Sequence, residues 1–395
     1  MKVLHVNDHL ALKGGVEVYM LALSRELEER GMDVAVAFAS GDANAWQHVY
    51  RVPSISTVDL RKVREGRREM SRVLAKFRPD VCHIHNLYNP GILEACLAHG
   101  PCVLHLHDYR YVCPSSNLYY RRTREICERS CSPACFPIGV VRGCQTPRLP
   151  ASLSFYSRVK FIEKHAHRFN AVVANSRYVA ARFEQNVHGV VEPEVIHYFC
   201  PIEASSQPPR ATKKPYILFL GRVIESKGIL EFVDTLGRLP DDVEGVIAGA
   251  PRDDVRRLVD ARASNAKCLD RLRWTGWVDR DQIAKLVEGA GVVVFPSIWA
   301  EPFGIVGLEA MARGVPVVGF DVGGVSDWLL DGENGYLIPR GDVCRMADKI
   351  DTILRDSNLR SSLGQRGIEI VREQFSVETH VNALLALYQR RAHGK

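Results

Sequence analysis

The stretch Glu301-Pro-Phe-Gly-Ile-Val-Gly-Leu-Glu309 lies between an apolar run at 292–295, typical of a buried strand, and a helical pattern that ends at a glycine. Two carboxylates therefore flank a strand-to-helix turn, where Gly304 lets the backbone approach a ligand closely. The first N–H groups of the helix face this turn and suit a phosphate. Eight helical steps span at most about 12 Å, roughly the distance from the sugar to the ribose of a nucleotide diphosphosugar. We predict that Glu301 holds sugar hydroxyls and that Glu309 accepts from the ribose diol; the alternative is a loop charge and a helix-solvating side chain.

The length of 395 residues exceeds what one hydrophobic core usually supports, so two domains are expected. The composition, 46% hydrophobic and 25% charged, is ordinary for a globular protein. No apolar run approaches the length of a membrane span, and the polar start Met1–His9 does not fit a signal peptide. We therefore expect a cytoplasmic protein whose eleven cysteines are reduced or bind metal. The net charge of +6 is too modest to indicate a nucleic-acid partner.

Short β-rich runs alternate with helical patterns, which predicts an α/β protein with parallel sheets. The predicted strands are 3–6, 34–38, 81–85, 102–107 and 171–174 in the first half, and 216–220, 245–248, 292–295 and 315–320 in the second. The segment Glu203–Pro215 is rich in proline, serine and charge, and it is the predicted linker between two Rossmann-like halves. Near the C-terminus, Ser376 is a predicted N-cap for a helix whose apolar stripe runs to Tyr388 and must be buried.

Three glycine-containing motifs follow predicted strands. Gly14-Gly15 opens a helix and suits close approach to a phosphate or sugar, although a plain turn fits equally well. Gly221-Arg222 and Lys227-Gly228 follow the strand at 216–220, at the edge where open α/β sheets bind ligands. A guanidinium and an ammonium together suit a diphosphate leaving group, whereas the alternative is a solvated basic loop.

These motifs, together with the Glu301–Glu309 segment and Gly323-Gly324, resemble the retaining GT-B glycosyltransferases of glycosyltransferase family 4. The resemblance covers nearly the whole chain. It implies an α/β fold of two Rossmann-like domains that face each other across a cleft, with a C-terminal helix that crosses back to the N-terminal domain. The implied parts are an acceptor-binding domain at 1–203 with a Cys-rich insert at about 113–144, a nucleotide-sugar-binding domain at 204–372, and the crossing helix at 373–395.

The resemblance also implies an activity. A sugar would move from a UDP- or GDP-sugar to an acceptor hydroxyl with retention of anomeric configuration, in polysaccharide, glycolipid or glycoconjugate biosynthesis. The leaving phosphate would help deprotonate the acceptor, so neither a catalytic metal nor a cofactor would be required. The alternatives are a sugar-nucleotide epimerase or hydrolase of the same fold, and a non-catalytic nucleotide-sugar-binding subunit.

Site residues follow from the same resemblance, position by position. Arg222 and Lys227 would neutralise the departing diphosphate, and Glu301 would orient the sugar. His107 ends the strand at 102–107 and would reach the donor sugar; Asn86 is a further candidate. The predicted catalytic set is His107, Arg222, Lys227 and Glu301, and the predicted donor-binding set is Gly14, Gly15, Gly221, Trp277, Phe303, Gly304, Ile305 and Glu309. Asp281 is a predicted N-cap and not a metal ligand, since this fold uses no metal-binding aspartate pair.

Five thiols gather within a short stretch: Cys113, Cys127, Cys131, Cys135 and Cys144. They could bind a structural zinc ion, although none shows the two-residue spacing of a zinc ribbon or finger. Plain thiols in an irregular insert on the acceptor side are the favoured interpretation. A disulfide is the least favoured, because the expected compartment is reducing.

Basic residues are concentrated in the first half, and they are predicted to form one cationic helix: Arg61, Lys62, Arg64, Arg67, Arg68, Arg72, Lys76 and Arg78. A second basic group lies near aromatic residues and comprises Lys160, Lys164 and Arg168. Such runs are usually solvated faces. Their concentration here also suits anionic lipid headgroups, or an anionic lipid-linked or polysaccharide acceptor, and therefore a peripheral position at the inner face of the membrane.

Overall fold

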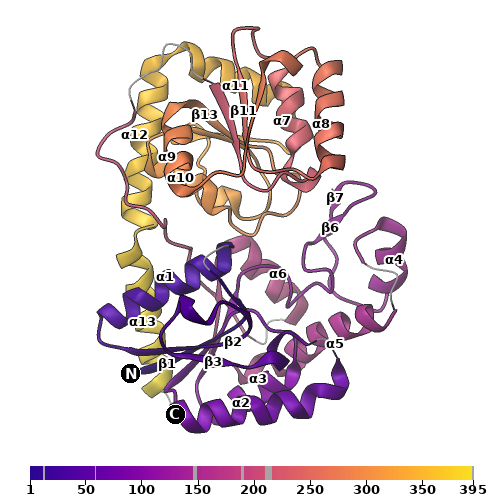
Figure 1. Ribbon diagram of the computed structural model, residues 1–395, viewed down its shortest axis with the longest axis vertical. Coiled ribbons are helices and arrows are strands. Elements are labelled where there is room, and N and C mark those ends of the chain that lie inside the picture. The colour runs from indigo at the N-terminus through magenta and orange to yellow at the C-terminus, as the bar shows by residue number, and fades with distance from the viewer. Residues whose placement is uncertain (12–13, 58, 146–148, 188–190, 210–215, 394–395) are drawn as a thin grey trace. The chain divides into compact units, whose positions relative to one another are not determined.

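The computed structural model describes residues 1–11, 14–57, 59–145, 149–187, 191–209 and 216–393 (Figure 1). The chain divides into two compact units. The first comprises Met1–Thr123, Cys127–Tyr198 and Val377–Lys395, and the second comprises Arg124–Ile126 and Phe199–Ser376. Each unit contains its own parallel sheet with helical crossovers, which is the Rossmann-like arrangement predicted from the alternating pattern.

The first unit has a seven-stranded parallel sheet of order β3-β2-β1-β4-β5-β8-β9. Its strands are β1 (Lys2–Leu10), β2 (Asp33–Gly41), β3 (Val49–Arg51), β4 (Val81–Ile84), β5 (Cys102–Leu106), β8 (Ala171–Ala174) and β9 (Glu194–Val195). Its crossover helices are α1 (Gly15–Glu29), α2 (Val63–Phe77), α3 (Pro90–His99), α5 (Leu149–His165) and α6 (Arg177–Val187). Every residue of β4, β5 and β8 is buried, because central parallel strands are covered on both faces.

The second unit has a six-stranded parallel sheet of order β12-β11-β10-β13-β14-β15. Its strands are β10 (Tyr216–Leu220), β11 (Gly245–Ala248), β12 (Leu272–Gly276), β13 (Ala290–Phe295), β14 (Val317–Phe320) and β15 (Gly335–Ile338). Its helices are α7 (Ile229–Leu236), α8 (Asp253–Asn265), α9 (Arg280–Gly289), α10 (Ile305–Ala312), α11 (Val343–Arg355) and α12 (Ser357–Gln374).

Shorter elements complete the described chain. A two-stranded sheet pairs β6 (Tyr119–Tyr120) with β7 (Glu125–Ile126), and α4 (Cys135–Arg142) follows it. Short 3-10 helices occupy Ala43–Ala45, Pro53–Ser56, Leu60–Lys62, Ala166–Arg168, Glu225–Lys227, Leu269–Arg271 and Gly323–Asp327. None of the helices in the described ranges is both long enough and apolar enough to span a membrane.

The C-terminal helix α13 (Val377–His393) leaves the second unit and belongs to the first, as the resemblance implied. It packs beside α1 (Figure 1). Val381, Leu384 and Tyr388 are fully buried, and the Tyr388 hydroxyl lies 2.5 Å from Nδ1 of His83. This is where the predicted apolar stripe is buried.

All nine predicted strands are present, and three of them have the predicted bounds. The sequence pattern missed β3, β9, β12 and β15, which lie at or near the edges of the two sheets. Edge strands are covered on fewer sides, so polar residues interrupt their apolar runs; β12 reads Leu-Arg-Trp-Thr-Gly. His85 and His107 were assigned to strand ends, but β4 stops at Ile84 and β5 at Leu106.

Two local predictions need correction. Asp279, and not Asp281, is the N-cap of α9: its carboxylate accepts from the backbone N–H of Gln282, whose side chain accepts in turn from the N–H of Asp279. The described part of the predicted linker belongs to the second unit; Ser205 donates its backbone N–H to the carbonyl of Ala312 at 2.7 Å. Residues 210–215 of that linker lie outside the described residues.

Candidate functional site

In both sheets, the strand that comes first in the chain lies in the middle. The next strands along the chain lie on one side of it, and the later strands lie on the other side. The order reverses between β1 and β4 in the first unit, and between β10 and β13 in the second. In open α/β sheets, ligands bind outside the carboxyl ends of the two strands at such a reversal. The loops after β10, β13 and β14 therefore form the candidate site of the second unit. The loops after β1, β4 and β5 form that of the first.

Lys227 and Glu301 form a close ion pair in the second unit. The Lys227 ammonium lies 2.9 Å from Oε1 and 2.7 Å from Oε2 of Glu301. Oε2 also accepts from the hydroxyl of Ser297 at 3.0 Å and from the indole N–H of Trp299 at 2.9 Å. The side chain of Glu301 is only 6% exposed and that of Lys227 20% exposed. A buried carboxylate is thus held in one orientation by three donors, with a partly exposed cation against it.

Glycines fix the loops that carry this pair. A Cβ on Gly228 would lie 1.6 Å from the carbonyl oxygen of Pro296, and the N–H of Ile298 donates to the carbonyl of Ser226 at 3.0 Å. A Cβ on Gly323, at φ 59°, would lie 2.1 Å from the carbonyl oxygen of Glu301. Because only glycine permits these approaches, the turn after β10 and the loops after β13 and β14 hold one another in place.

The turn before α10 has the geometry expected at a ligand. Gly304 has φ 98° and ψ 60°, and Ile305 is the first helical residue, so the first N–H groups of α10 have no partner within the helix. Phe303 is buried, and its carbonyl accepts from the indole N–H of Trp328 at 2.7 Å. Burial raises the pKa of Glu309, although Arg313 and Arg280 oppose the shift.

Gly221, Arg222, Trp277 and Glu309 are the remaining predicted donor-site residues of the second unit. Gly221, with φ 134°, and the exposed side chain of Arg222 directly follow β10. Trp277 is 70% exposed after β12. The geometry therefore joins Lys227 to Glu301 directly, and it places Arg222 and Glu309 on neighbouring segments of the same sheet edge.

A cluster of buried histidines occupies the switch point of the first unit. Its members are His5, His83, His85, His105 and His107. Strand register explains the gathering, because His5 pairs with His83 across β1 and β4, and alternate residues of each strand share a face. His85 shares hydrogen bonds with His5 at 2.8 Å and with His107 at 2.7 Å, and His83 shares one with His105 at 3.1 Å.

Tyrosines, one of them on α13, supply further hydrogen bonds to this cluster, although Nε2 of His5 and Nε2 of His105 are buried without a hydrogen-bond partner among the described residues. His107 Nδ1 bonds to the hydroxyl of Tyr198, and the hydroxyl of Tyr19 lies 2.7 Å from Nε2 of His380. Ligand nitrogens on a tetrahedral zinc ion lie roughly 3.3 Å apart, which is longer than the 2.7–2.8 Å contacts of His85. These contacts are hydrogen bonds between neutral rings. Both ring nitrogens of His107 are occupied, so neither faces a ligand in this arrangement.

Burial keeps these histidines neutral. It lowers the pKa of His5 and of His107 to about 3, and that of His380 to about 4. The pKa values of the other three members lie well below the ordinary value for the same reason, with the neighbouring histidines adding to the shift. A neutral histidine network of this kind orders the ends of β1, β4 and β5.

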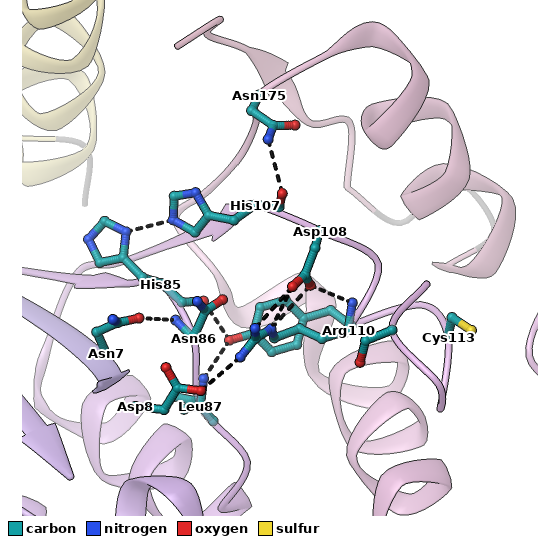
Figure 2. A network of polar contacts seen from close by, with 12 residues as sticks. Asn7, Asp8, His85, Asn86, Leu87, His107, Asp108, Arg110, Cys113 and Asn175 are labelled. Carbon is teal, nitrogen blue, oxygen red and sulfur yellow. Dashed lines mark hydrogen bonds and ion pairs between the residues drawn. The ribbon is translucent and has the colours of Figure 1, made fainter. Parts of the chain in front are cut away.

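The charged side chains of Asp8, Asp108 and Arg110 lie near His85 and His107 and contact one another (Figure 2). The guanidinium of Arg110 donates to Asp108 at 3.0–3.2 Å and to Asp8 at 3.1 Å. Burial alone would raise the pKa of Asp108, but the charge and hydrogen bonds of Arg110 outweigh it and lower that pKa. Nearby, the N–H of Asn86 donates to the side-chain oxygen of Asn7 at 3.1 Å, which joins the loop after β4 to β1.

Arg158 on α5 is a buried cation near this group. Its residue is 3% exposed, and its guanidinium lies 4.9 Å above the ring of Tyr88, which Arg110 also contacts at 5.4 Å. Its Nη2 donates to the hydroxyl of Ser116 at 3.1 Å, but Nε and Nη1 have no hydrogen-bond partner among the described residues. Burial and the neighbouring Arg110 lower the pKa of Arg158. An unmatched buried cation is a candidate recognition point for an anion.

Comparisons with known proteins show the family and the fold of the chain. Residues 13–201 match the family described as Glycosyltransferase Family 4, and residues 202–370 match Glycosyl transferases group 1. The chain belongs to the family 4 glycosyltransferases. Its two Rossmann-like units are the GT-B fold, as solved structures of low sequence identity show. A glycosyltransferase from Rickettsia africae has a TM-score of 0.77 at 16% identity, covering 100% of this chain and 99% of that chain. Anabaena HepE in complex with UDP and glucose has a TM-score of 0.71 at 17% identity, covering 99% and 100%.

Curated relatives of this family 4 glycosyltransferase are more similar in sequence but match a smaller part. The lipopolysaccharide core biosynthesis glycosyltransferase LpsE of Rhizobium meliloti is 33% identical over 174 residues, 44% of this chain and 49% of that protein. The phosphatidyl-myo-inositol mannosyltransferase of Mycobacterium leprae is 38% identical over 160 residues, 40% and 41% respectively. The chain thus spans about half the length of the curated relatives it matches.

Several residues of this family 4 glycosyltransferase site were missed from the sequence. Ser297 and Trp299 lie between β13 and Glu301. Their positions in the sequence, close to the predicted sugar-binding carboxylate, could have identified them as site residues. Asp8 lies near the carboxyl end of β1 and Arg110 follows the end of β5, which is also where ligand-facing residues are expected. Arg158 had no such signal, because it lies within a helix and its burial depends on the packing of α5.

Proposed function

We propose that this family 4 glycosyltransferase transfers a glycosyl group from a nucleotide diphosphosugar, a UDP- or GDP-sugar, to an acceptor hydroxyl with retention of anomeric configuration. The observation that supports this most directly is the ion pair of Lys227 with Glu301 at the switch point of the second unit. It places a cation and an oriented carboxylate beside the N-terminus of α10, where a diphosphate and a sugar have complementary partners.

In the proposed reaction, the bond between the anomeric carbon and the diphosphate oxygen breaks, and its electron pair stays on that oxygen. The acceptor oxygen forms the new bond on the same face of the sugar, and its proton passes to the departing phosphate. Lys227 and Arg222 stabilise the charge that develops on the phosphate, and the first N–H groups of α10, from Ile305 onwards, contribute to the same end. Glu301 holds the sugar hydroxyls, and Glu309 the ribose diol.

We keep the remaining predicted donor contacts in the proposal. Gly221 follows β10 without a side chain in the way, since no atom lies within 4 Å of a Cβ placed there. Gly14 has φ 100° and, with Gly15, opens α1 after β1. The exposed Trp277 is available to a base, and the buried Phe303 fixes the turn at Gly304. We keep His107 as a candidate for the catalytic site of the first unit, where it would act through the Tyr198 and His85 hydrogen bonds.

The proposal is tested with the purified full chain. A thermal-shift screen of UDP- and GDP-sugars identifies the donor, because a ligand that binds the folded state raises its melting temperature. The labelled donor is then incubated with and without lipid-linked and polysaccharide acceptors, and NMR assigns the anomeric configuration of the product. Transfer with retention is expected. Formation of an epimer without acceptor would instead indicate an epimerase, and donor binding without turnover on any acceptor would indicate a binding subunit.

The acceptor side of the proposal includes a cationic surface on α2. Arg64, Arg67, Arg68 and Arg72 line one shallow hollow on the exposed face of this helix, and no carboxylate among the described residues pairs with three of them. Adjacent uncompensated cations repel each other, so an external anion would stabilise the face. We propose that this face contacts anionic lipid headgroups and so holds the enzyme peripherally at a membrane.

Vesicles test this directly. Replacing Arg64, Arg68 and Arg72 with glutamine is expected to weaken binding to phosphatidylserine-containing vesicles by about 100-fold, at roughly 1 kcal/mol per residue near the surface. Binding of the unaltered chain should fall as salt rises. Replacing Arg252, Arg257 and Arg355, exposed arginines of the second unit, is the matched control and should change little. Equal loss with both triple variants would contradict a specific role for α2.

Arg158 tests whether the acceptor itself is anionic. Arg158→Met is expected to raise the KM for an anionic acceptor about 10- to 100-fold, because a charge-assisted hydrogen bond contributes roughly 1.5–3 kcal/mol. Its free energy of unfolding should change by no more than about 1 kcal/mol, since the substitution also removes an unmatched buried charge. Kinetics with varied acceptor and urea unfolding measure the two quantities. Arg25→Met, at an exposed position on α1, is the control; an unchanged KM in Arg158→Met would exclude this contact.

A further inference from the structure

The five thiols of the Cys-rich insert do not form a metal site. They are all free and line one small cavity, but among the described residues no three of their sulfur atoms lie close enough together to hold one metal ion. The structural zinc ion that their number suggested therefore has no ligand set there.

In the second unit, the carboxylate of Glu301 is bound unequally at its two oxygens. Oε2 accepts from Lys227 at 2.7 Å, from Ser297 at 3.0 Å and from Trp299 at 2.9 Å. Among the described residues, Oε1 accepts only from Lys227, at 2.9 Å. A carboxylate oxygen offers two lone pairs, so Oε1 keeps acceptor capacity that Oε2 has used. Oε1 is therefore the oxygen with capacity left for a sugar hydroxyl in the proposed reaction.

The difference between the two oxygens depends on the short stretch Ser297–Trp299. The hydroxyl of Ser297 and the indole N–H of Trp299 both donate to Oε2. Ile298 lies between them and is 3% exposed. Because the two donors lie on either side of Ile298, a rotation of its backbone would turn at least one of them away from Oε2. The orientation of Glu301 thus depends on how firmly Ile298 is held.

The backbone of Ile298 is held on two sides. Its N–H donates to the carbonyl of Ser226 at 3.0 Å, in the turn that carries Lys227. Its carbonyl accepts from Nε of Arg340 at 2.7 Å. This second bond is charge-assisted, and such bonds are stronger than those between neutral groups. Arg340 therefore fixes the peptide unit that leads from Ile298 to Trp299.

Arg340 is itself presented by an ordered turn. It follows β15 and is the second residue of the four-residue turn that starts at Pro339. The N–H of Asp342 donates to the carbonyl of Pro339 at 3.0 Å, and Gly341 has φ 84°, a conformation that favours glycine. The carboxylate of Asp342 also caps α11. The end of β15 and the start of α11 thus fix the backbone of Arg340, which suits a side chain that holds another loop in place.

The bonds of Arg340 go to backbone carbonyls rather than to a carboxylate. Besides Ile298, its guanidinium donates to the carbonyl of Arg124, also a residue of the second unit. No carboxylate of the described residues forms an ion pair with it. The residue is exposed, so replacing it leaves no charge buried without a partner, and surface substitutions of this kind usually change stability little. A variant at Arg340 should therefore stay folded.

We propose that Arg340 is a positioning residue for the donor sugar. By holding the Ile298 carbonyl, it keeps Ser297 and Trp299 on Oε2 of Glu301 and leaves Oε1 to a sugar hydroxyl. In this role Arg340 acts only through Glu301 and makes no contact with the donor. The inference rests on the proposed function, because it assumes that Glu301 holds the sugar.

Binding of nucleotides with and without a sugar tests this role. Calorimetry on the full chain compares UDP with UDP-glucose, UDP-galactose and UDP-N-acetylglucosamine, and GDP with GDP-mannose. For the nucleotide sugar that the unaltered chain binds best, Arg340→Met is expected to raise Kd about 10-fold, the effect of one lost hydrogen bond, and to leave Kd for the matching nucleoside diphosphate unchanged. Arg340→Lys should recover part of the loss, because an ammonium can also donate to the Ile298 carbonyl. Arg238→Met is the matched control, since Arg238 is an exposed arginine of the second unit that likewise donates to a backbone carbonyl.

The outcomes separate this inference from the proposed function. Equal weakening of the nucleoside diphosphate and the nucleotide sugar in Arg340→Met would mean that Arg340 binds phosphate or only supports the fold, and would overturn the inference alone. Unchanged binding of both would overturn it too. If the unaltered chain bound none of the nucleotide sugars, the proposed function would fail, and the inference with it.

A combined variant tests whether Arg340 acts through the two donors to Oε2. Ser297→Ala with Trp299→Phe removes both donors and should raise Kd for the nucleotide sugar by itself. Adding Arg340→Met to this background should change that Kd less than about twofold, because effects that share one pathway are not additive. In each variant, Kd for the nucleoside diphosphate checks that the site is folded. If the two losses multiplied instead, Arg340 would act independently of Ser297 and Trp299, and the proposed positioning role would be wrong.

Discussion

Lys227→Met is expected to lower kcat/KM by about 10²- to 10³-fold, the usual effect of removing one donor that stabilises developing charge in a transition state. The same substitution should lower the free energy of unfolding by about 3–5 kcal/mol, because it leaves the buried carboxylate of Glu301 without its cation. Initial rates with saturating acceptor and urea unfolding measure the two effects. Lys285→Met, on the exposed face of α9, is the control and should change neither quantity.

The double variant Lys227→Met with Glu301→Gln separates catalysis from stability. Neutralising both partners removes the unpaired charge, so most of the lost stability should return, while Ser297 and Trp299 can still bond to the new amide oxygen. Activity should stay at the level of the Lys227→Met variant or fall further, because both proposed contacts to the donor are gone. If the double variant recovered activity along with stability, the ion pair would be structural, and the proposed role of Lys227 would be wrong.

The second unit was the more predictable part of the molecule, and the Glu301 loop shows why. This loop follows a buried strand, has a glycine at its turn and precedes a helix. These are local features, so the sequence pattern suffices to predict them. The hydrogen bonds of Ser297 and Trp299 to Glu301 depend on the side-chain directions within an irregular loop, and no periodicity encodes these.

The first unit shows the opposite case. The histidines at 83, 85, 105 and 107 were visible as alternate residues of two predicted strands, yet the cluster they form with His5 requires β1 to lie beside β4 and in one register. Strand order is a property of the whole chain rather than of any one segment. No local sequence pattern predicts the burial of Arg158, because only the packing of α5 against Tyr88 buries its guanidinium. The features that could not be predicted from the sequence therefore depend on tertiary packing.

Acid is expected to unfold the first unit between about pH 6 and pH 5, because its buried histidines must stay neutral. The folded-state pKa values, about 3 for His5 and His107 and about 4 for His380, lie below the unfolded value of about 6.5. The stability that these groups contribute is complete above pH 6.5. It is lost as the pH falls, because the unfolded state then binds protons that the folded state does not.

The size of the effect follows from the number of groups. Each such histidine costs about 1.4 kcal/mol of stability per pH unit below the unfolded pKa. Six are buried in the first unit, the five of the cluster and His380, so the summed slope can reach about 8 kcal/mol per pH unit, comparable with the whole stability of a domain. Urea unfolding as a function of pH gives the slope. Hydrogen exchange in β1, β4 and β5 should report the loss before exchange in β10 and β13 changes.

One substitution tests whether the buried histidines cause the dependence of the unfolding free energy on pH. His105→Gln removes one titrating group, so its unfolding free energy should depend on pH less steeply by about 1.4 kcal/mol per unit below pH 6, whatever its absolute stability. His167→Gln, at an exposed position in the same unit, should leave the slope unchanged. A slope equal in the unaltered chain and in His105→Gln would mean that the network accepts protons while folded. The neutral hydrogen-bonded cluster described above would then be wrong, because rings that share protons at 2.7–2.8 Å cannot all become charged and keep those contacts.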